Sequence, residues 1–210
     1  MREVEDILNS RSLTPSERIS TRCHILPSGG LSLVVSGIIL TDDNMLGKNY
    51  VFETPVPNKD DVNSSLMYYC QIGDNTDVRL RSTLHLLAQI TREPCFDQLR
   101  TKEQLGYIVF SGTWSLTGVL SFKITIQSER TPIYLESRVD AFLEQLRGHI
   151  TDMSPETFDR ERQSLIDKKM DKLKNLGQET NRFWAHIHDG YNDFLRREFN
   201  CPVLSCQSTQ

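Results

Sequence analysis

The sequence predicts an α+β fold, in which an antiparallel sheet is covered on one face by helices. Two observations lead to this prediction. Residues 65–72 and 119–127 are strand-like, and the second segment alternates apolar and polar residues cleanly. The last third of the chain instead carries apolar residues at helical spacing and strong helix-start signals. Strands first, one helix between them and then helices form the pattern of an α+β domain.

The N-terminal part gives the weakest signals. Residues 2–10 are charged and helix-like and contain no apolar leader segment, so we do not expect a secretory signal. Residues 22–27 and 50–56 are strand-like, and 31–40 form an apolar run. That run is too short for a bilayer, which needs roughly 20 apolar residues.

The central part predicts a strand, a long helix and a hairpin. Asp74 and Asp77 offer N-cap chemistry for a helix over 78–90, which Pro94 should kink or end. A short helical piece over 95–105 then leads into a strand at 107–111. This strand pairs with 119–127 through a turn at 113–118.

The C-terminal part predicts three helices. Pro132 begins the first, and Ser154 with Pro155 begins the second as N-cap and first helical residue. Gly177 is interpreted as the break between the second and third helices. The apolar stripe of the first consists of Leu135, Val139, Phe142, Leu143 and Leu146, and the third carries Phe183, Trp184 and Ile187.

Charge and cysteine content exclude several function classes. The chain has 24 Lys and Arg against 28 Asp and Glu, mixed along its length. This pattern gives no footprint for nucleic acid or a membrane surface, so neither is expected as a partner. The five cysteines are far apart without a C-x-x-C pair, which favours reduced thiols over disulfides or a zinc ribbon.

The sequence contains no complete active site. Its five histidines form neither H-E-x-x-H nor H-x-x-E-H, and His186 and His188 are two apart on an expected helix, where they point in different directions. A nucleophile elbow, a phosphate-binding loop and a dinucleotide fingerprint are also missing. We therefore expect no metal ligands and no cofactor in this chain.

The most informative segment is 93–112, which reads EPCFDQLRTKEQLGYIVFSG. Arg100 falls near the end of a short helix and Tyr107 at the start of a strand. If the helix runs through the join, the seven-residue spacing places both side chains on one side. A guanidinium and a phenol hydroxyl there suit a peptide carbonyl or a developing oxyanion. The alternative is structural: Arg100 pairs with Glu103 or Asp97, and Tyr107 is an aromatic at the core edge.

The same segment resembles the fourth domain of insulin-degrading enzyme and other pitrilysin-type inverted-motif zinc metallopeptidases, with fungal members the most similar in character. The run L-R-T-K-E-Q-L-G-Y carries most of this resemblance, which extends less closely over 50–191. It implies a domain of the pitrilysin and mitochondrial-processing-peptidase type. It also implies that Arg100 and Tyr107 are auxiliary catalytic residues, which contact the substrate backbone and the transition state.

The resemblance implies the non-zinc C-terminal half of a zinc metalloendopeptidase that degrades intracellular peptides and is inactive alone. Zinc is expected in a separate N-terminal half, which would be a partner together with peptide substrates; a dimer stays open. The alternatives are a non-catalytic peptide-binding or dimerisation module and a truncated relic. The cytoplasm is the expected location, with mitochondrion and peroxisome left open.

The resemblance also defines the expected domain organisation. Residues 1–20 are interpreted as the end of a preceding domain or a linker, and 21–195 as the peptidase-family domain. Residues 29–48 fit its pattern poorly and are interpreted as an insertion, and 196–210 as a divergent tail. Because the last helix and strand of such a domain are not recognised, we expect it to be incomplete at the C-terminus.

Overall fold

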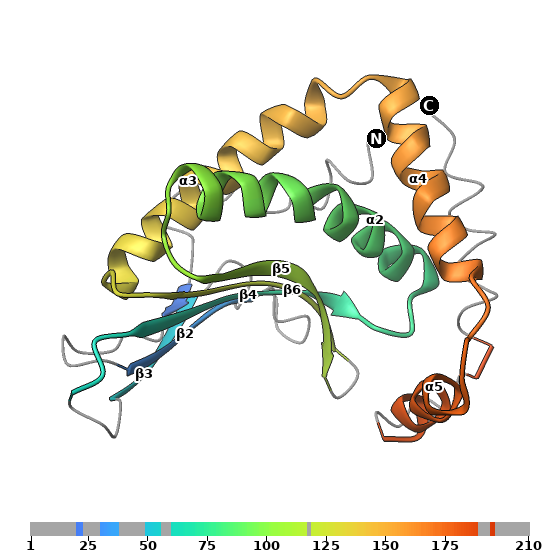
Figure 1. Ribbon diagram of the computed structural model, residues 1–210, viewed down its shortest axis with the longest axis horizontal. Helices are drawn as coiled ribbons and strands as arrows, with labels where there is room; N and C mark the ends of the chain where they lie inside the picture. Colours follow the sequence, from blue (N-terminus) through green and yellow to red (C-terminus); the bar gives the residue numbers. More distant parts are fainter. Residues whose placement is uncertain are drawn as a thin grey trace.

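A six-stranded sheet forms the base of the molecule, with the strand order β3-β1-β2-β4-β6-β5 (Figure 1). The computed structural model describes residues 20–22, 30–37, 49–55, 60–116, 119–188 and 194–195, the first three ranges by their backbone only. The strands are β1 (Ser20–Arg22), β2 (Gly30–Gly37), β3 (Asn49–Pro55), β4 (Ser64–Asp74), β5 (Ile108–Leu116) and β6 (Val119–Ser128).

The sequence predicts the pairing of β5 with β6, and the structure adds β4 on the other side of β6. β4 pairs with β6, and β6 with β5, in antiparallel ladders. Alternate residues of β4 and β6 are buried, as expected for a sheet covered on one side. Beyond β4 the sheet becomes mixed, because β2 runs parallel to β4 and β1 runs parallel to β3. The chain that returns between β2 and β4 contains β3, which makes this parallel pairing possible.

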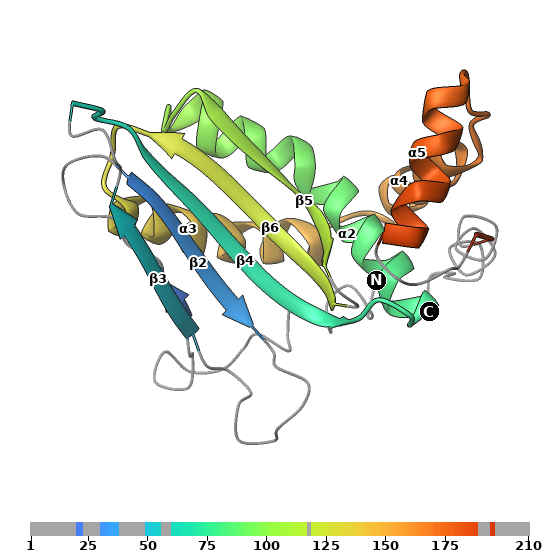
Figure 2. The same cartoon turned by 90° about the horizontal axis from the view of Figure 1, so that it is seen from below.

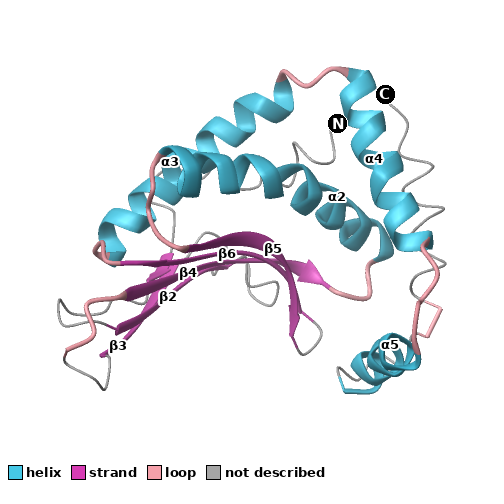
Figure 3. Ribbon diagram, viewed as in Figure 1, coloured by secondary structure: helices cyan, strands magenta, loops and turns pink. Residues whose placement is uncertain are grey.

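Helices α2 (Val78–Cys95) and α3 (Pro132–Thr151) lie over one face of this sheet (Figures 1 and 3). Asp77 caps α2, since its carboxylate accepts from the backbone N–H groups of Arg79 and Leu80. Helix α4 (Pro155–Met170) begins at the predicted Ser154 cap, and α5 (Leu176–His188) follows it. The α+β class and the one-sided helical cover are therefore confirmed.

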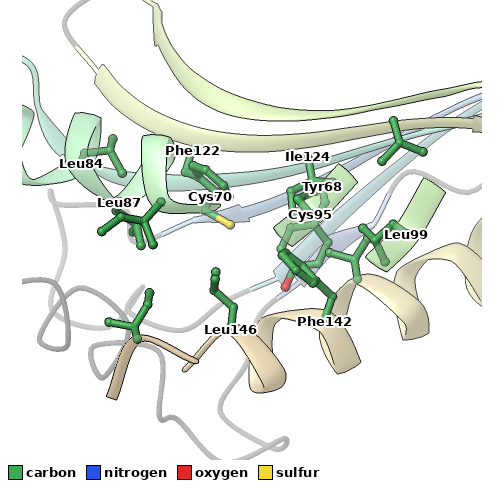
Figure 4. Packing of buried hydrophobic residues seen from close by; sticks show 14 of the residues in the cluster. Tyr68, Cys70, Leu84, Leu87, Cys95, Leu99, Phe122, Ile124, Phe142 and Leu146 are labelled. Atoms are coloured by element: carbon green, nitrogen blue, oxygen red, sulfur yellow. The ribbon is translucent and has the colours of Figure 1, made fainter. Parts of the chain in front are cut away.

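The core lies between the sheet and α2 and α3 (Figure 4). Leu66 and Cys70 of β4 and Phe122 and Ile124 of β6 point into it. The predicted stripe of α3 is buried at Leu135, Val139, Phe142 and Leu146, while Leu143 is partly buried. Tyr68 adds a polar tie, since its hydroxyl donates to Asp140 Oδ1 on α3 at 3.1 Å.

Three local predictions differ from the structure. Helix α2 extends past Pro94 and ends at Cys95, where a π-helix continues it. Gly177 does not break a helix, because α4 already ends at Met170 and Gly177 lies in the first turn of α5. The hairpin connection is shorter than predicted, since β5 continues to Leu116 and pairs there with Val119.

The interpreted insertion at 29–48 contributes strand β2, which lies between β1 and β4. Residues 1–19 and the tail at 196–210, to which separate roles were assigned from sequence, lie outside the described residues. In the described ranges, no helix is long and apolar enough to cross a membrane.

Candidate functional site

The segment that carries Arg100 is a π-helix, η1 (Phe96–Lys102), which continues directly from α2. The change of helix type follows Pro94, which has no N–H to donate to the preceding turn. The N–H of Phe96 contacts both Arg92 O and Glu93 O, and Glu103 N donates to Gln98 O at 3.0 Å, five residues back. Short π-helical segments are often found at functional sites.

One side of η1 is anchored in the core. Leu99 is fully buried, and Leu105 and Val109 are nearly so. The N–H of Leu105 donates to Leu99 O at 3.0 Å, which closes the end of the π-helix over these leucines. Cys95 is also buried, and burial raises the pKa of its thiol to about 11. This thiol stays protonated at neutral pH and is not a nucleophile.

The opposite side of η1 presents Arg100 between two aromatic rings. The guanidinium carbon lies 5.1 Å from the centre of the Phe96 ring and 5.6 Å from that of Tyr107. Arg100 Nε donates to the backbone carbonyl of Tyr107 at 3.2 Å. Rings at these distances attract the cation and limit its rotation. The structure therefore brings the two sequence-predicted residues into direct contact.

Tyr107 is held at this place by the backbone before it. Gln104 has a positive φ of 52°, which turns the chain back after η1. At Gly106 the backbone passes so close to β6 that an added Cβ would lie 1.8 Å from Gln127 O. Tyr107 follows at once, with 85% of its surface exposed. Its ring is thus outside the core, which removes the core-edge interpretation.

The carboxylates that the structural alternative assigned to Arg100 have other partners. Asp97 pairs with Lys102 at 2.8 Å. Glu103 accepts two hydrogen bonds from Arg138 of α3, at 2.7 and 2.8 Å. In the described part of the chain, no carboxylate pairs with Arg100. Its terminal nitrogens and the exposed Tyr107 hydroxyl can therefore donate to an acceptor that approaches from solvent.

Sequence reasoning found the pair through a geometry that the structure does not have. The helix does not run through the join, and a turn with backbone contacts brings Tyr107 back to Arg100. It also missed Phe96, although Phe96 precedes Arg100 by four residues, a spacing that places side chains together on helices. The tie between Glu103 and Arg138 had no local signal, because the two residues are 35 positions apart.

The described residues include no group of three or more His, Cys, Asp or Glu side chains that could hold a metal ion. The side chains that directly contact Arg100 are the aromatic rings of Phe96 and Tyr107, which are not zinc ligands. What this site offers chemically is hydrogen-bond donors and positive charge.

Comparisons with known proteins agree on the family that this chain resembles. Residues 86–184, which include the whole site, match the family model described as PQQ synthase PqqF-like, C-terminal lobe domain 4. A putative zinc protease of Schizosaccharomyces pombe, mug138, is 43% identical over 159 residues, which cover 76% of this chain and 16% of that protein. Insulin-degrading enzyme of Homo sapiens is 49% identical over 113 residues, covering 54% of this chain and 11% of that protein.

A solved structure supports the fold independently. The crystal structure of pitrilysin aligns with a TM-score of 0.59 and 24% identity, covering 70% of this chain and 16% of that chain. The resemblance that the sequence indicates is therefore confirmed. The chain spans less than one fifth of the length of these relatives, so that it corresponds to one region of a much larger protein in each case.

Proposed function

Since the chain is related to the C-terminal lobe of insulin-degrading enzymes and pitrilysin-type zinc proteases, we propose that it is the non-zinc, substrate-contacting part of a peptidase. In this role Arg100 and Tyr107 contact the peptide backbone, and the chain has no hydrolytic activity alone. The expected substrates are intracellular peptides, and the expected location is the cytoplasm, with peroxisome and mitochondrion as alternatives. The domain would comprise residues 21–195.

In such an enzyme, zinc bound by the N-terminal half would polarise the scissile carbonyl and activate water. The residues of this chain would act on the same carbonyl from the other side. The terminal nitrogens of Arg100 and the Tyr107 hydroxyl would donate to the oxygen as negative charge develops on it. Because Arg100 is already fixed by two rings and a carbonyl, little reorganisation would accompany the reaction.

The observation that supports this proposal most strongly is that Arg100 has no acidic partner in the described part of the chain. Two aromatic rings and a backbone carbonyl hold it instead, so its terminal nitrogens stay available to a ligand. The exposure of Tyr107 also supports the proposal: the residue is 85% exposed, so its ring contributes little to the core.

The test is a peptidase assay on a quenched fluorescent peptide, with the purified full chain alone and after mixing with the zinc-bearing half of the S. pombe relative. We expect activity only in the mixture. Losing one oxyanion donor typically lowers kcat by roughly 10²–10³-fold, so Arg100→Ala and Tyr107→Phe should each reduce it to that extent. Arg160→Ala changes an exposed arginine of α4 and serves as the matched control.

Two outcomes would overturn the proposal. Activity of the chain alone that a chelator abolishes would mean that the chain itself binds a catalytic metal. A folded chain that forms the mixed complex but gives no activity would remove the catalytic role.

A second candidate is a peptide-binding module that does not take part in catalysis. In the described part of the chain, no helix covers the face of the sheet opposite α2 and α3 (Figure 2). On β5, Val109 is buried toward the core, so the exposed Ile108 and Phe110 and the partly exposed Trp114 lie on the opposite face. Lys123 Nζ lies 4.6 Å from the Trp114 ring centre and 5.9 Å from that of Phe110. A peptide that binds the chain, with affinity lowered by Trp114→Ala and unaffected by Arg100→Ala, would favour this candidate. A dimer, the third form left open, would be detected by sedimentation.

A further inference from the structure

Glu103, which follows the π-helix that carries Arg100, makes a charged contact with α3. Glu103, directly after η1, receives Arg138 Nε on one carboxylate oxygen at 2.7 Å and Arg138 Nη2 on the other at 2.8 Å. A planar guanidinium that meets both oxygens fixes orientation as well as distance. The two side chains are 14% and 31% exposed, so the contact is partly shielded from water.

The same carboxylate also closes the last turn of η1. Gln98 Nε2 donates to Glu103 Oε1 at 2.7 Å, while Glu103 N donates to Gln98 O at 3.0 Å. The backbone and the side chain of Glu103 therefore both bond to Gln98 of η1, and its carboxylate also bonds to Arg138 of α3. The hydrogen bond from Arg138 is the main reason that the pKa of Glu103 lies below its ordinary value.

This tie lies between the two candidate substrate contacts in the sequence. Glu103 follows Arg100 by three positions and precedes Tyr107 by four. On the core side, buried Leu99 and Leu105 hold the segment in place. Gln104 in this turn is exposed and has a positive φ, so this part of the turn lies outside the core. The Arg138 fork holds the turn there.

Since the proposed function gives Arg100 and Tyr107 their role, we infer that Glu103 and Arg138 are positioning residues for this pair. They do not contact the substrate. They hold the turn after η1 so that Arg100 Nε meets the carbonyl of Tyr107 and the two donors face one acceptor. Without them the core leucines would keep η1 in place, but the angle between the two side chains would vary.

The first test observes Arg100 directly and does not depend on activity. In the full chain labelled with ¹⁵N-arginine, the Nε–H signal of Arg100 is identified by its loss in Arg100→Lys. In Glu103→Gln and in Arg138→Met we expect this signal to shift and to exchange with water faster. The paired change Glu103→Arg with Arg138→Glu should restore it, because the Gln98 amide can flip and accept instead of donating.

The matched control is the ion pair between Asp97 and Lys102, which lies on the same π-helix but does not reach α3. It is more exposed than the Glu103 pair, and exposed pairs contribute little. Asp97→Asn, which breaks this pair without leaving an unpaired carboxylate near Arg100, should leave the Arg100 signal unchanged. The same variants are then assayed in the mixed peptidase. Misplacement by about 1 Å can cost about 10²-fold, so kcat should fall by up to that factor in Glu103→Gln, with KM changed little.

The outcomes separate this inference from the proposed function. If the Arg100 signal is unchanged in folded Glu103→Gln and Arg138→Met, the positioning role is wrong, whatever the activity. If the signal changes and the paired variant restores both signal and kcat, the inference stands. If the signal changes but Arg100→Ala itself has no effect on activity, the tie orders Arg100 but the catalytic proposal fails.

Discussion

Replacing Gly106 by alanine should disrupt the join between η1 and β5. An ideal Cβ at this position would lie 1.8 Å from Gln127 O and 2.8 Å from Gln127 C. Both are backbone atoms of β6, and Gln127 is the ladder partner of Ile108 at the start of β5. A flexible side chain could move aside, but this backbone is held on its other side by β4.

These contacts give the expected loss in the free energy of unfolding. The closest distance has to grow from 1.8 Å to about 3.0 Å, the lower limit of real Cβ contacts. Overpacking of this kind costs about 1–3 kcal/mol. Moving the β5 end away from β6 weakens at least one ladder hydrogen bond, worth about 1 kcal/mol. We therefore expect Gly106→Ala to lower the free energy of unfolding by about 2–4 kcal/mol.

The assay is urea unfolding followed by circular dichroism, with Gly148→Ala as the matched control. Gly148 lies on the exposed side of α3, and an added Cβ there meets nothing within 4 Å. Alanine in the interior of a helix is favoured over glycine by about 0.8–1.0 kcal/mol. The same substitution should thus stabilise the chain at one site and destabilise it at the other. In thermal unfolding, each kcal/mol corresponds to about 2–4 °C for a domain of this size.

Equal stability of Gly106→Ala and the wild type would refute this reasoning, because it would mean that the backbone of η1 and β6 can separate by more than 1 Å at no cost. The functional consequence provides a second check. Tyr107 follows Gly106 directly, so the variant should also lose the Arg100 Nε contact to Tyr107 O, which the Arg100 signal reports.

Two further predictions concern stability. Glu103 has a lowered pKa in the folded chain because Arg138 donates to it, so its contribution is present above its ordinary pKa of 4.5 and is lost as the pH falls through the folded-state value. Unfolding free energy measured below about pH 5 should therefore fall less steeply in Glu103→Gln, and an identical slope would contradict this. Asp77→Ala removes the cap of α2 and should cost about 1 kcal/mol, whereas Asp77→Asn, which keeps an acceptor oxygen, should cost less.

The parts of the fold that depend on local chemistry could be predicted from the sequence. Asp77 and Ser154 cap helices because a short oxygen-bearing side chain reaches backbone N–H groups two or three residues on. The sequence identifies Ser154 directly and Asp77 as one of two positions, with Asp74. It also identifies β6 by the alternation of apolar and polar residues and β4 by its aromatic content. Gly177 shows the limit of such signals, since glycine is also tolerated in the first turn of a helix.

The site depends on interactions that no local sequence pattern indicates. Whether Pro94 ends, kinks or widens a helix is decided by where the following residues pack, and buried Cys95 and Leu99 keep the chain helical. The parallel pairing of β2 with β4 is likewise set by a long connection. The segment 93–112 nevertheless pointed to two residues that the structure brings into contact, Arg100 and Tyr107, because its resemblance to a family contained the result of these contacts.

The arrangement around η1 separates stability from function within one short segment. Residues on its inner side, Leu99 and Leu105, are buried and determine where the π-helix lies. Residues on its outer side, Arg100 and Tyr107, are exposed and contribute little to the core. A π-turn has i→i+5 hydrogen bonds, so it changes which residues face outward relative to an α-turn. The outer residues could thus be selected for contact with a ligand, while the inner residues and the Glu103 tie keep them in place.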